Sequence, residues 1–410
     1  MMISIQTQWS VSLYLLAFVS LIITSGRFGD LIGRRSTLIV GLIIFTFGSL
    51  LGGLAHNAIE ILLGRVLQGF GSAIMWPNTT ALVFTSAGEN KKAFAMGVLM
   101  GVAGLAMSFG PPLAGFLSTV LNWRWFFLFN VPIGLAILIY ISFFVDIPNK
   151  KTEGSIDYKG LIVLTTAIIL LVFGINEFAK NVVLFLIMLS MAAVLIYIFY
   201  RIEVKIKHPL IDISLFKNSY FVLGCSIRWL VNFSYYILLF IMGLYLHTVL
   251  KYTTFQAGAL LLPMTILIGL ISPFGGKLID QIGAKKPVMI CLILFFISYL
   301  SFIILNICHT TLLILALFIL PGICFGVISS GLMVIAMRSV PEEKAGVASG
   351  IFYMMSVFGS LVGVTLSGLI LTLCKHATLQ ATLFSGFPWI MITCALAIML
   401  GGVLLTFVKS

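Results

Sequence analysis

The stretch Gly26-Arg27-Phe28-Gly29-Asp30-Leu31-Ile32-Gly33-Arg34-Arg35 occurs a second time as Gly276-Lys277-Leu278-Ile279-Asp280-Gln281-Ile282-Gly283-Ala284-Lys285-Lys286. In both copies a glycine precedes the aspartate by four residues, another glycine follows it by three, and a basic pair comes next. The copies begin 250 residues apart, and each lies between two long apolar runs. A repeat at this distance indicates two structurally related halves, which is how many transporters are built.

The composition of the chain is that of a membrane protein. Hydrophobic residues make up 61% of the 410 residues and charged residues 9%, whereas a soluble protein would have about 25% charged residues. Continuously apolar runs of about 20 residues are each long enough to cross the membrane as a helix, and they lack the alternation of barrel strands. We therefore expect an all-α polytopic bundle of 13 spans, at 10–26, 37–56, 60–86, 92–119, 125–146, 158–178, 181–201, 218–247, 254–276, 287–307, 311–335, 345–374 and 387–408.

The basic residues predict the orientation of these helices. Of the 24 lysines and arginines, 18 fall in one set of loops, 4 fall in the opposite set, and Arg65 and Arg228 lie within spans. Cytoplasmic loops carry such an excess of Lys and Arg, so we expect the richer set, and the C-terminus with it, in the cytoplasm. The net charge of +12 is thus a topology signal, and nucleic acid is not an expected partner.

The repeat also reveals an asymmetry in the helix count. The second loop follows two predicted helices, 218–247 and 254–276, whereas the first follows only 10–26. The simplest plan is two halves of six helices with two extra helices between them, and with the first helix of the first half absent. A truncated or misassigned start is the favoured cause, and a natural thirteen-helix variant is the alternative. The expected domains are a five-helix N-terminal half, a linker region with two extra helices (158–178 and 181–201) and a six-helix C-terminal half, at 1–146, 147–216 and 217–410.

The repeated loop resembles the cytoplasmic signature of the major facilitator superfamily. Its glycines allow a tight turn and close helix approach, and Asp30 is expected to cap the next helix and to accept hydrogen bonds from cations. The alternative is a simple turn whose basic residues only keep this loop on the cytoplasmic side. In the family this loop is part of the inner gate, with its basic cluster bridging the halves, so the resemblance implies a gating loop made of Gly26, Asp30, Gly33, Arg34, Arg35, Gly276, Asp280 and Gly283.

A charged residue lies inside the predicted span 60–86. The segment Gly64-Arg65-Val66-Leu67-Gln68-Gly69 resembles the family motif Arg-x-x-Gln-Gly. A charge within a span is costly and normally faces a cavity or a partner, and Gln68 lies on the same helical face as Arg65. The resemblance implies that both residues act in proton transfer or substrate response; the alternative is a structural arginine that reaches the outer interface.

The predicted span 92–119 is rich in small residues. Its segment Phe109-Gly110-Pro111-Pro112-Leu113-Ala114-Gly115 resembles the antiporter motif Gly-Pro-x-x-Gly-Gly, although Phe116 stands in place of the last glycine. In the family this helix seals the two halves together, whereas a general small-residue packing face is the alternative. The residues assigned to this motif are Gly101, Gly104, Gly110, Pro111 and Gly115.

The segment Asn122-Trp123-Arg124-Trp125-Phe126-Phe127-Leu128-Phe129-Asn130-Val131-Pro132-Ile133-Gly134 is similar to a signature of the fourteen-helix drug:proton antiporters. Together with the helix plan, it extends the resemblance to this subfamily over nearly the whole chain. The resemblance implies a multi-pass protein of the bacterial cytoplasmic (inner) membrane that exports small amphipathic compounds, without a cofactor and with the proton gradient as its energy source. We expect a monomer in contact with membrane lipid; a periplasmic adaptor is left undecided.

Substrate sites in such transporters lie near the bilayer midplane, between the halves. In the predicted span 218–247, Arg228 lies about 13 Å into the helix at ~1.5 Å per residue. Asn232, Tyr235 and Tyr236 follow on the same face. We expect these four residues to line the cavity, with Asn78 as a weaker candidate; an arginine satisfied by neighbouring carbonyl groups is the alternative.

None of the twelve acidic residues lies near the middle of a predicted span. Proton coupling needs a carboxylate that binds and releases a proton as its exposure changes, and the family commonly carries one in its first helix. We therefore expect this 410-residue form to be inactive or poorly coupled.

The favoured function is proton-coupled export of amphipathic drugs or toxic compounds by alternating access. Export of one specific metabolite, such as a siderophore or a lipid-like molecule, is one alternative, and a truncated, non-transporting remnant is another. An enzyme is not expected, because the sequence shows no metal-ligand cluster, nucleophile elbow or phosphate-binding loop.

Overall fold

The computed structural model describes the backbone of residues 2–144, 157–177, 181–206, 211, 213–308, 310–338, 340–374 and 379–408. The regular elements in these residues are all helices, which confirms the expected all-α class. Four are short 3-10 helices, and the α-helices are α1 (Met2–Ile32), α2 (Arg34–Leu54), α3 (Ala58–Ser86), α4 (Lys92–Val120), α5 (Trp125–Leu128), α6 (Asn130–Phe144), α7 (Tyr158–Glu177), α8 (Val182–Glu203), α9 (Ser219–Thr248), α10 (Thr254–Ile282), α11 (Lys285–Ser301), α12 (Thr311–Met337), α13 (Ala345–Leu373) and α14 (Leu379–Thr406).

Eleven helical segments in the described residues are long and apolar enough to cross a membrane. One of them, Trp125–Phe144, comprises α5 and α6, and α1 makes a twelfth if its two parts, which meet at 50°, count as one span. The expectation was thirteen. The remaining helix, α7, has a shorter apolar segment, Tyr158–Leu171, in the described residues.

Polar side chains fix where several of these helices begin. Asn57 accepts a hydrogen bond from the backbone N–H of Glu60 at the start of α3, and Asn218 caps α9 in the same way. At the start of α10, Thr253 and Gln256 form a reciprocal capping box. Such caps satisfy N–H groups that have no partner within the helix.

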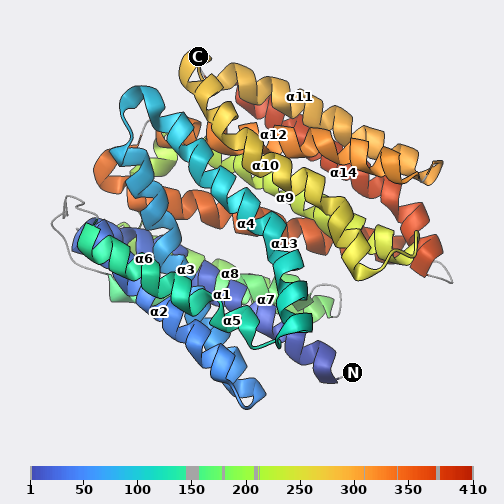
Figure 1. The fold of residues 1–410 in the computed structure, drawn as a ribbon. Coiled ribbons are helices and arrows are strands. Elements are labelled where there is room, and N and C mark those ends of the chain that lie inside the picture. Colours follow the sequence, from blue (N-terminus) through green and yellow to red (C-terminus); the bar gives the residue numbers. More distant parts are fainter. Residues whose placement is uncertain are drawn as a thin grey trace.

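The helices form two bundles with a hairpin beside them. In the first bundle, α3 packs against α1 and α2, and α6 packs against α2; in the second, α9 packs against α13 and α14, and α12 against α10 and α11. Figure 1 shows these groups one above the other, with α4 and α13 between them. The main contacts between the bundles pair α4 with α10 and α1 with α13, and the α7–α8 hairpin touches α1 and α13.

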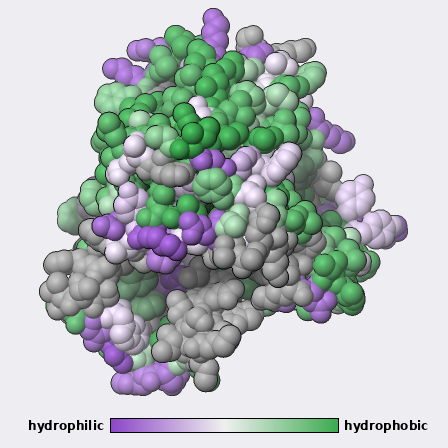
Figure 2. Space-filling view, turned by 90° about the vertical axis from the view of Figure 1, so that its right-hand side faces the viewer, coloured by the Kyte–Doolittle hydropathy of each residue, from purple (hydrophilic) through white to green (hydrophobic). Residues whose placement is uncertain are grey.

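Large apolar side chains cover much of the outer surface. Phe143, Phe144 and Leu312 are each at least 74% exposed, and many other aliphatic and aromatic residues are also exposed. Figure 2 shows broad hydrophobic areas, with hydrophilic residues gathered in smaller patches. Such a surface suits lipid rather than water.

The two repeated loops adopt the same turn. Gly33, between α1 and α2, has φ of 105°, and Gly283, between α10 and α11, has φ of 82°. Positive φ is readily adopted only by glycine, which explains why both copies carry one at this place. We call the end of the molecule that holds both turns the basic end.

Alanine at Gly283 should lower stability through backbone strain alone. A Cβ there would meet no atom within 4 Å, but an L-residue in this conformation costs roughly 1–2 kcal/mol. Gly243, inside α9, is the matched control: a Cβ there also meets nothing, so alanine should stabilise by roughly 0.5–1 kcal/mol. Apparent melting temperatures of the two variants in detergent should move in opposite directions, and a shift of the same sign would contradict this explanation.

Candidate functional site

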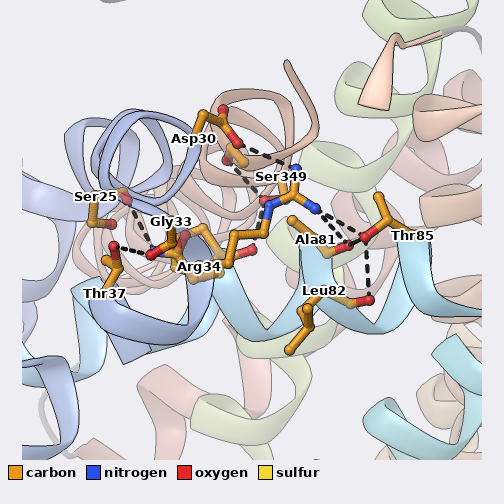
Figure 3. A network of polar contacts seen from close by, with 12 residues as sticks. Ser25, Asp30, Gly33, Arg34, Thr37, Ala81, Leu82, Thr85 and Ser349 are labelled. Carbon is orange, nitrogen blue, oxygen red and sulfur yellow. Dashed lines mark hydrogen bonds and ion pairs between the residues drawn. The ribbon is translucent and has the colours of Figure 1, made fainter. Parts of the chain in front are cut away.

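Asp30 lies at the end of α1, against the start of α13 in the other bundle. Its side chain is 3% exposed and accepts a hydrogen bond from Arg34 Nη2 at 3.2 Å. A Cβ on Gly346 would come within 2.7 Å of Asp30 Oδ1, and the carboxylate also interacts with the backbone N–H of Val347 in the first turn of α13. Figure 3 shows Asp30 facing the guanidinium group of Arg34.

Asp280 makes the reciprocal contact from the second bundle to the first. Its Oδ1 accepts from the backbone N–H of Ala93 at 2.9 Å, and its Oδ2 accepts from that of Phe94 at 2.8 Å. Both N–H groups lie at the start of α4, where a negative charge is favourable. Each repeated loop therefore places its carboxylate on the first turn of a helix in the opposite bundle. We call these two contacts the crossed caps.

The basic pair of the first loop contacts the first bundle. Arg34 donates to Thr85 Oγ1 of α3 at 2.9 Å (Figure 3), and Arg35 donates to two backbone carbonyl groups of α6. Gly33, between Asp30 and this pair, takes the N-cap position of α2. The expected capping of α2 by Asp30 and the expected bridge between the halves through the basic cluster stay predictions.

Glycines allow α4 and α10 to lie in close contact. A Cβ on Gly101 would be 2.7 Å from the carbonyl oxygen of Gly269, and one on Gly104 would be 2.9 Å from the Gly269 nitrogen. Gly276 lies against the backbone of Ala93 in the same way, and Gly26 lies against that of Gly346 between α1 and α13. Small residues at such contacts let helix backbones approach one another.

Gly110 of the predicted antiporter motif is placed differently. A Cβ on Gly110 would meet no atom within 4 Å, so this glycine does not belong to the α4–α10 contact. Pro111 and Gly115 fall outside the residues whose surroundings the structure describes.

Arg65 and Gln68 form a polar group inside the first bundle. Arg65 Nη1 donates to Gln68 Oε1 at 3.0 Å, and Gln68 Nε2 donates to Ser49 Oγ of α2 at 2.8 Å. The guanidinium group lies 4.5 Å from the ring centre of Tyr14, whose hydroxyl donates to Ser72 Oγ. This group joins α1, α2 and α3.

Leucine at Gln68 should destabilise the first bundle. It removes the acceptor for Arg65 Nη1 and the donor to Ser49 Oγ, and hydrogen bonds to a charged group contribute roughly 1.5–3 kcal/mol each. Ser72→Ala is the milder control, since it removes one hydroxyl partner of Tyr14 and leaves the Arg65–Gln68 pair. A lower apparent melting temperature for Gln68→Leu than for Ser72→Ala would support this role; equal values would contradict it.

Arg228 lies where α9, α12 and α13 meet. It is 6% exposed; its Nε donates to Ser356 Oγ at 2.8 Å and its Nη1 to Ser329 Oγ at 3.0 Å. The guanidinium carbon lies 5.6 Å from the ring centre of Phe325 and 5.4 Å from that of Phe352. Hydroxyl groups and aromatic rings are thus the described neighbours of this cation.

The other predicted cavity residues have distinct surroundings. Asn232 is buried and donates to the carbonyl oxygen of Arg228 in its own helix. Tyr235 is 1% exposed and stacks on Phe325 with ring centres 4.0 Å apart, while Tyr236 is half-buried beside it.

Asn78 has the environment of a residue that joins two helices. It is fully buried, and its Nδ2 donates to the carbonyl oxygens of Ser25 on α1 and Ile74 on α3.

Three polar residues of α13 were missed by the reading of the sequence. Besides Ser356, these are Ser349, whose Oγ donates to the carbonyl oxygen of Pro77 at 3.0 Å, and Tyr353, whose hydroxyl accepts from Thr80 at 3.4 Å. Ser349 and Tyr353 connect α13 to α3 of the first bundle. The spacing of four and then three residues places all three on one helical face, and this was the signal that would have identified them.

A cavity of about 890 Å³ lies at the basic end, lined by residues of both bundles. Residues of α3 and α4 line one side, and residues of α9 to α13 line the other. Four cations line it together with Asp280: Lys92, Lys285, Lys286 and Arg338. A cavity of this volume is large enough to hold a drug-sized molecule.

Comparison with known proteins extends these observations. Residues 3–364 match the family described as the Major Facilitator Superfamily. The chain is 29% identical over 388 residues to the multidrug resistance protein Stp of Mycobacterium tuberculosis, an alignment that covers 93% of this chain and 72% of that protein. It is 26% identical over 369 residues to the multidrug transporter protein MdtP of Bacillus subtilis, covering 88% of this chain and 68% of that one.

A solved structure has the same overall fold. The crystal structure of the human organic anion transporter MFSD10 aligns with a TM-score of 0.65 over 97% of this chain and 82% of that one. The sequence identity is 17%, so this likeness concerns the fold alone.

Proposed function

This chain belongs to the Major Facilitator Superfamily, and we propose that it exports small amphipathic compounds from a bacterial cell by alternating access. It is a multi-pass membrane protein and a transporter rather than an enzyme. The multidrug names of its relatives Stp and MdtP support amphipathic toxic compounds as the proposed substrates.

The crossed caps carry this proposal. Asp30 and Asp280 each bind the first turn of a helix in the opposite bundle, and both contacts lie at the basic end. A pair of contacts that can form and break together is a means of closing and opening one end of a transport path. We interpret the bundles, with boundaries at 1–146 and 217–410 around the linker region 147–216, as the two moving halves.

The proposed orientation places the basic end in the cytoplasm. The excess of Lys and Arg in the loops at this end, 18 against 4, supports this orientation and a cytoplasmic C-terminus. The structure with intact crossed caps is then the state that is closed toward the cytoplasm. The proposed energy source is inward proton flow across the bacterial inner membrane, with no bound cofactor and with a monomer as the working unit.

Transport by the reconstituted full chain tests the proposal. Liposomes containing the protein are given a pH gradient, and the movement of ethidium, fluorescein and fluorescein methyl ester is followed by fluorescence. Gradient-driven movement of any of the three, abolished by a protonophore and absent from protein-free liposomes, would support proton-coupled export and would overturn the expectation that this 410-residue form is inactive or poorly coupled. Movement of a dye that does not depend on the pH gradient would contradict proton coupling. The absence of movement of all three dyes would contradict export by this chain.

A further inference from the structure

The described contacts of Arg228 are with neutral groups. Its two side-chain partners, Ser329 and Ser356, are neutral hydroxyl groups. Among the residues that the structure describes, no carboxylate forms an ion pair with this arginine. A buried guanidinium without a counter-charge is costly, and charges within membrane spans mark substrate or ion pathways.

The guanidinium group of Arg228 retains donors for a ligand. It carries five N–H groups in a planar fork. In the described part of the chain, the hydrogen bonds to protein use Nε and one N–H of Nη1, which leaves three N–H groups, two of them on Nη2. A planar donor set of this kind matches a carboxylate.

The same place offers aromatic surfaces and a free hydroxyl group. Phe325 and Phe352 lie beside the guanidinium group, and Tyr235 stacks on Phe325. The buried hydroxyl of Tyr235 has no hydrogen-bond partner among the described residues, although a buried phenol normally has one. An aromatic molecule with an acidic group would find both stacking surfaces and polar partners here.

The helices that carry Arg228 and Ser329 also line the cavity at the basic end. Tyr220 of α9 and Val334 of α12 line this cavity, and α9 and α12 also carry Arg228 and its partner Ser329. Arg228 follows Tyr220 by eight residues, roughly 12 Å along the helix. Among the described residues that line the cavity, four are cations and one, Asp280, is an anion. An excess of one sign of charge in a cleft concentrates ligands of the opposite sign.

We propose that the compounds carried by this protein are organic anions, and that Arg228 binds their carboxylate group. This inference rests on the proposed export function and names its substrate class. The basic cavity gathers the anion, Arg228 supplies the counter-charge near the middle of the membrane, and the rings around it hold the apolar part of the molecule.

Binding of a matched pair of dyes to the purified full chain tests this substrate class. Fluorescein carries a free carboxylate, its methyl ester does not, and fluorescence anisotropy gives the Kd of each. Arg228→Gln should raise the Kd of fluorescein by roughly tenfold or more, the usual range for a charge-assisted hydrogen bond, and leave that of the ester nearly unchanged. Arg228→Lys, which keeps the charge but not the fork, should give an intermediate Kd for fluorescein.

Lys277→Gln is the control for general electrostatics. Lys277 is an exposed cation of the basic end that does not line the cavity, so its loss should leave both Kd values unchanged. Thermal unfolding identifies any variant that fails to fold. If Arg228→Gln fails to fold, the Kd values of Arg228→Lys provide the test. An equal loss of affinity for fluorescein and for its ester in Arg228→Gln would overturn the proposal. Tighter binding of the ester than of fluorescein by the native chain would also overturn it.

The outcome is separable from that of the proposed export function. Gradient-driven transport of ethidium without binding of fluorescein would keep the exporter and overturn the preference for anions. Binding of fluorescein that depends on Arg228, without transport of any compound, would support the anion site and contradict export.

Discussion

Valine in place of Gly101 is expected to abolish transport. A Cβ at this position would lie 2.7 Å from the carbonyl oxygen of Gly269 and 3.2 Å from ring carbons of Pro273. Overpacking a tight contact costs roughly 1–3 kcal/mol, and here relief requires α4 to separate from α10. The closed basic end would then be lost, and transport should fall to background in liposomes that hold equal amounts of folded protein.

The matched control for Gly101→Val is Gly110→Val in the same helix. A Cβ on Gly110 would meet nothing within 4 Å, so this variant should keep most of its transport although it alters the resemblance to the antiporter motif. Equal losses at the two positions would show that the α4–α10 contact is not the reason for the effect. Full activity of Gly101→Val would contradict the role of this contact.

Alanine in place of Asp280 is expected to open the basic end. It removes two hydrogen bonds of 2.9 and 2.8 Å at the start of α4, and bonds to a charged group are worth roughly 1.5–3 kcal/mol each. A loss of about 3 kcal/mol from the closed state alone would change the ratio of closed to open molecules by roughly a hundredfold. Transport should fall strongly, because the caps no longer hold this end closed.

Labelling of a buried cysteine measures this opening. Ala93 is 0% exposed beneath Gly276, so a cysteine placed there should react slowly with a water-soluble maleimide in the native background and quickly with Asp280→Ala. Asp280→Asn keeps an oxygen acceptor and should lie between the two. Lys277→Gln, a charge change in the same loop, should label slowly; fast labelling of this control, or slow labelling with Asp280→Ala, would contradict the gate.

The sequence predicted the helices and the turns well, because these depend on local features. Continuous apolar runs determine spans, and a glycine with positive φ at Gly33 and Gly283 determines the reversal of the chain. The target of the aspartates was not predictable in this way. Asp280 binds the backbone N–H of Ala93, which is 187 residues away in the sequence. The residues around Asp280 do not indicate whether its carboxylate binds the start of the helix that follows it or the start of a distant helix such as α4.

The stripe around Arg228 illustrates the same limit. The spacing of Arg228 and Tyr235 placed them on one face of α9, and both are buried within the bundle. Their partners Ser329, Ser356 and Phe325 come from other helices. Serine and phenylalanine are ordinary residues of membrane helices, so only the packing of α9, α12 and α13 reveals which of them meet this cation.

The central claim, that two halves open alternately at opposite ends, is tested most directly by distances between spin labels. One pair, at Lys91 and Gln281, spans the bundles at the basic end, and the other, at His56 and Ile307, spans them at the opposite end; all four residues are exposed. The half-buried Cys308 and Cys374 are first replaced, since the other four cysteines are buried. On acidification with a transported compound present, the first distance should lengthen while the second shortens. Constant distances, or changes of the same sign at both ends, would contradict alternating access.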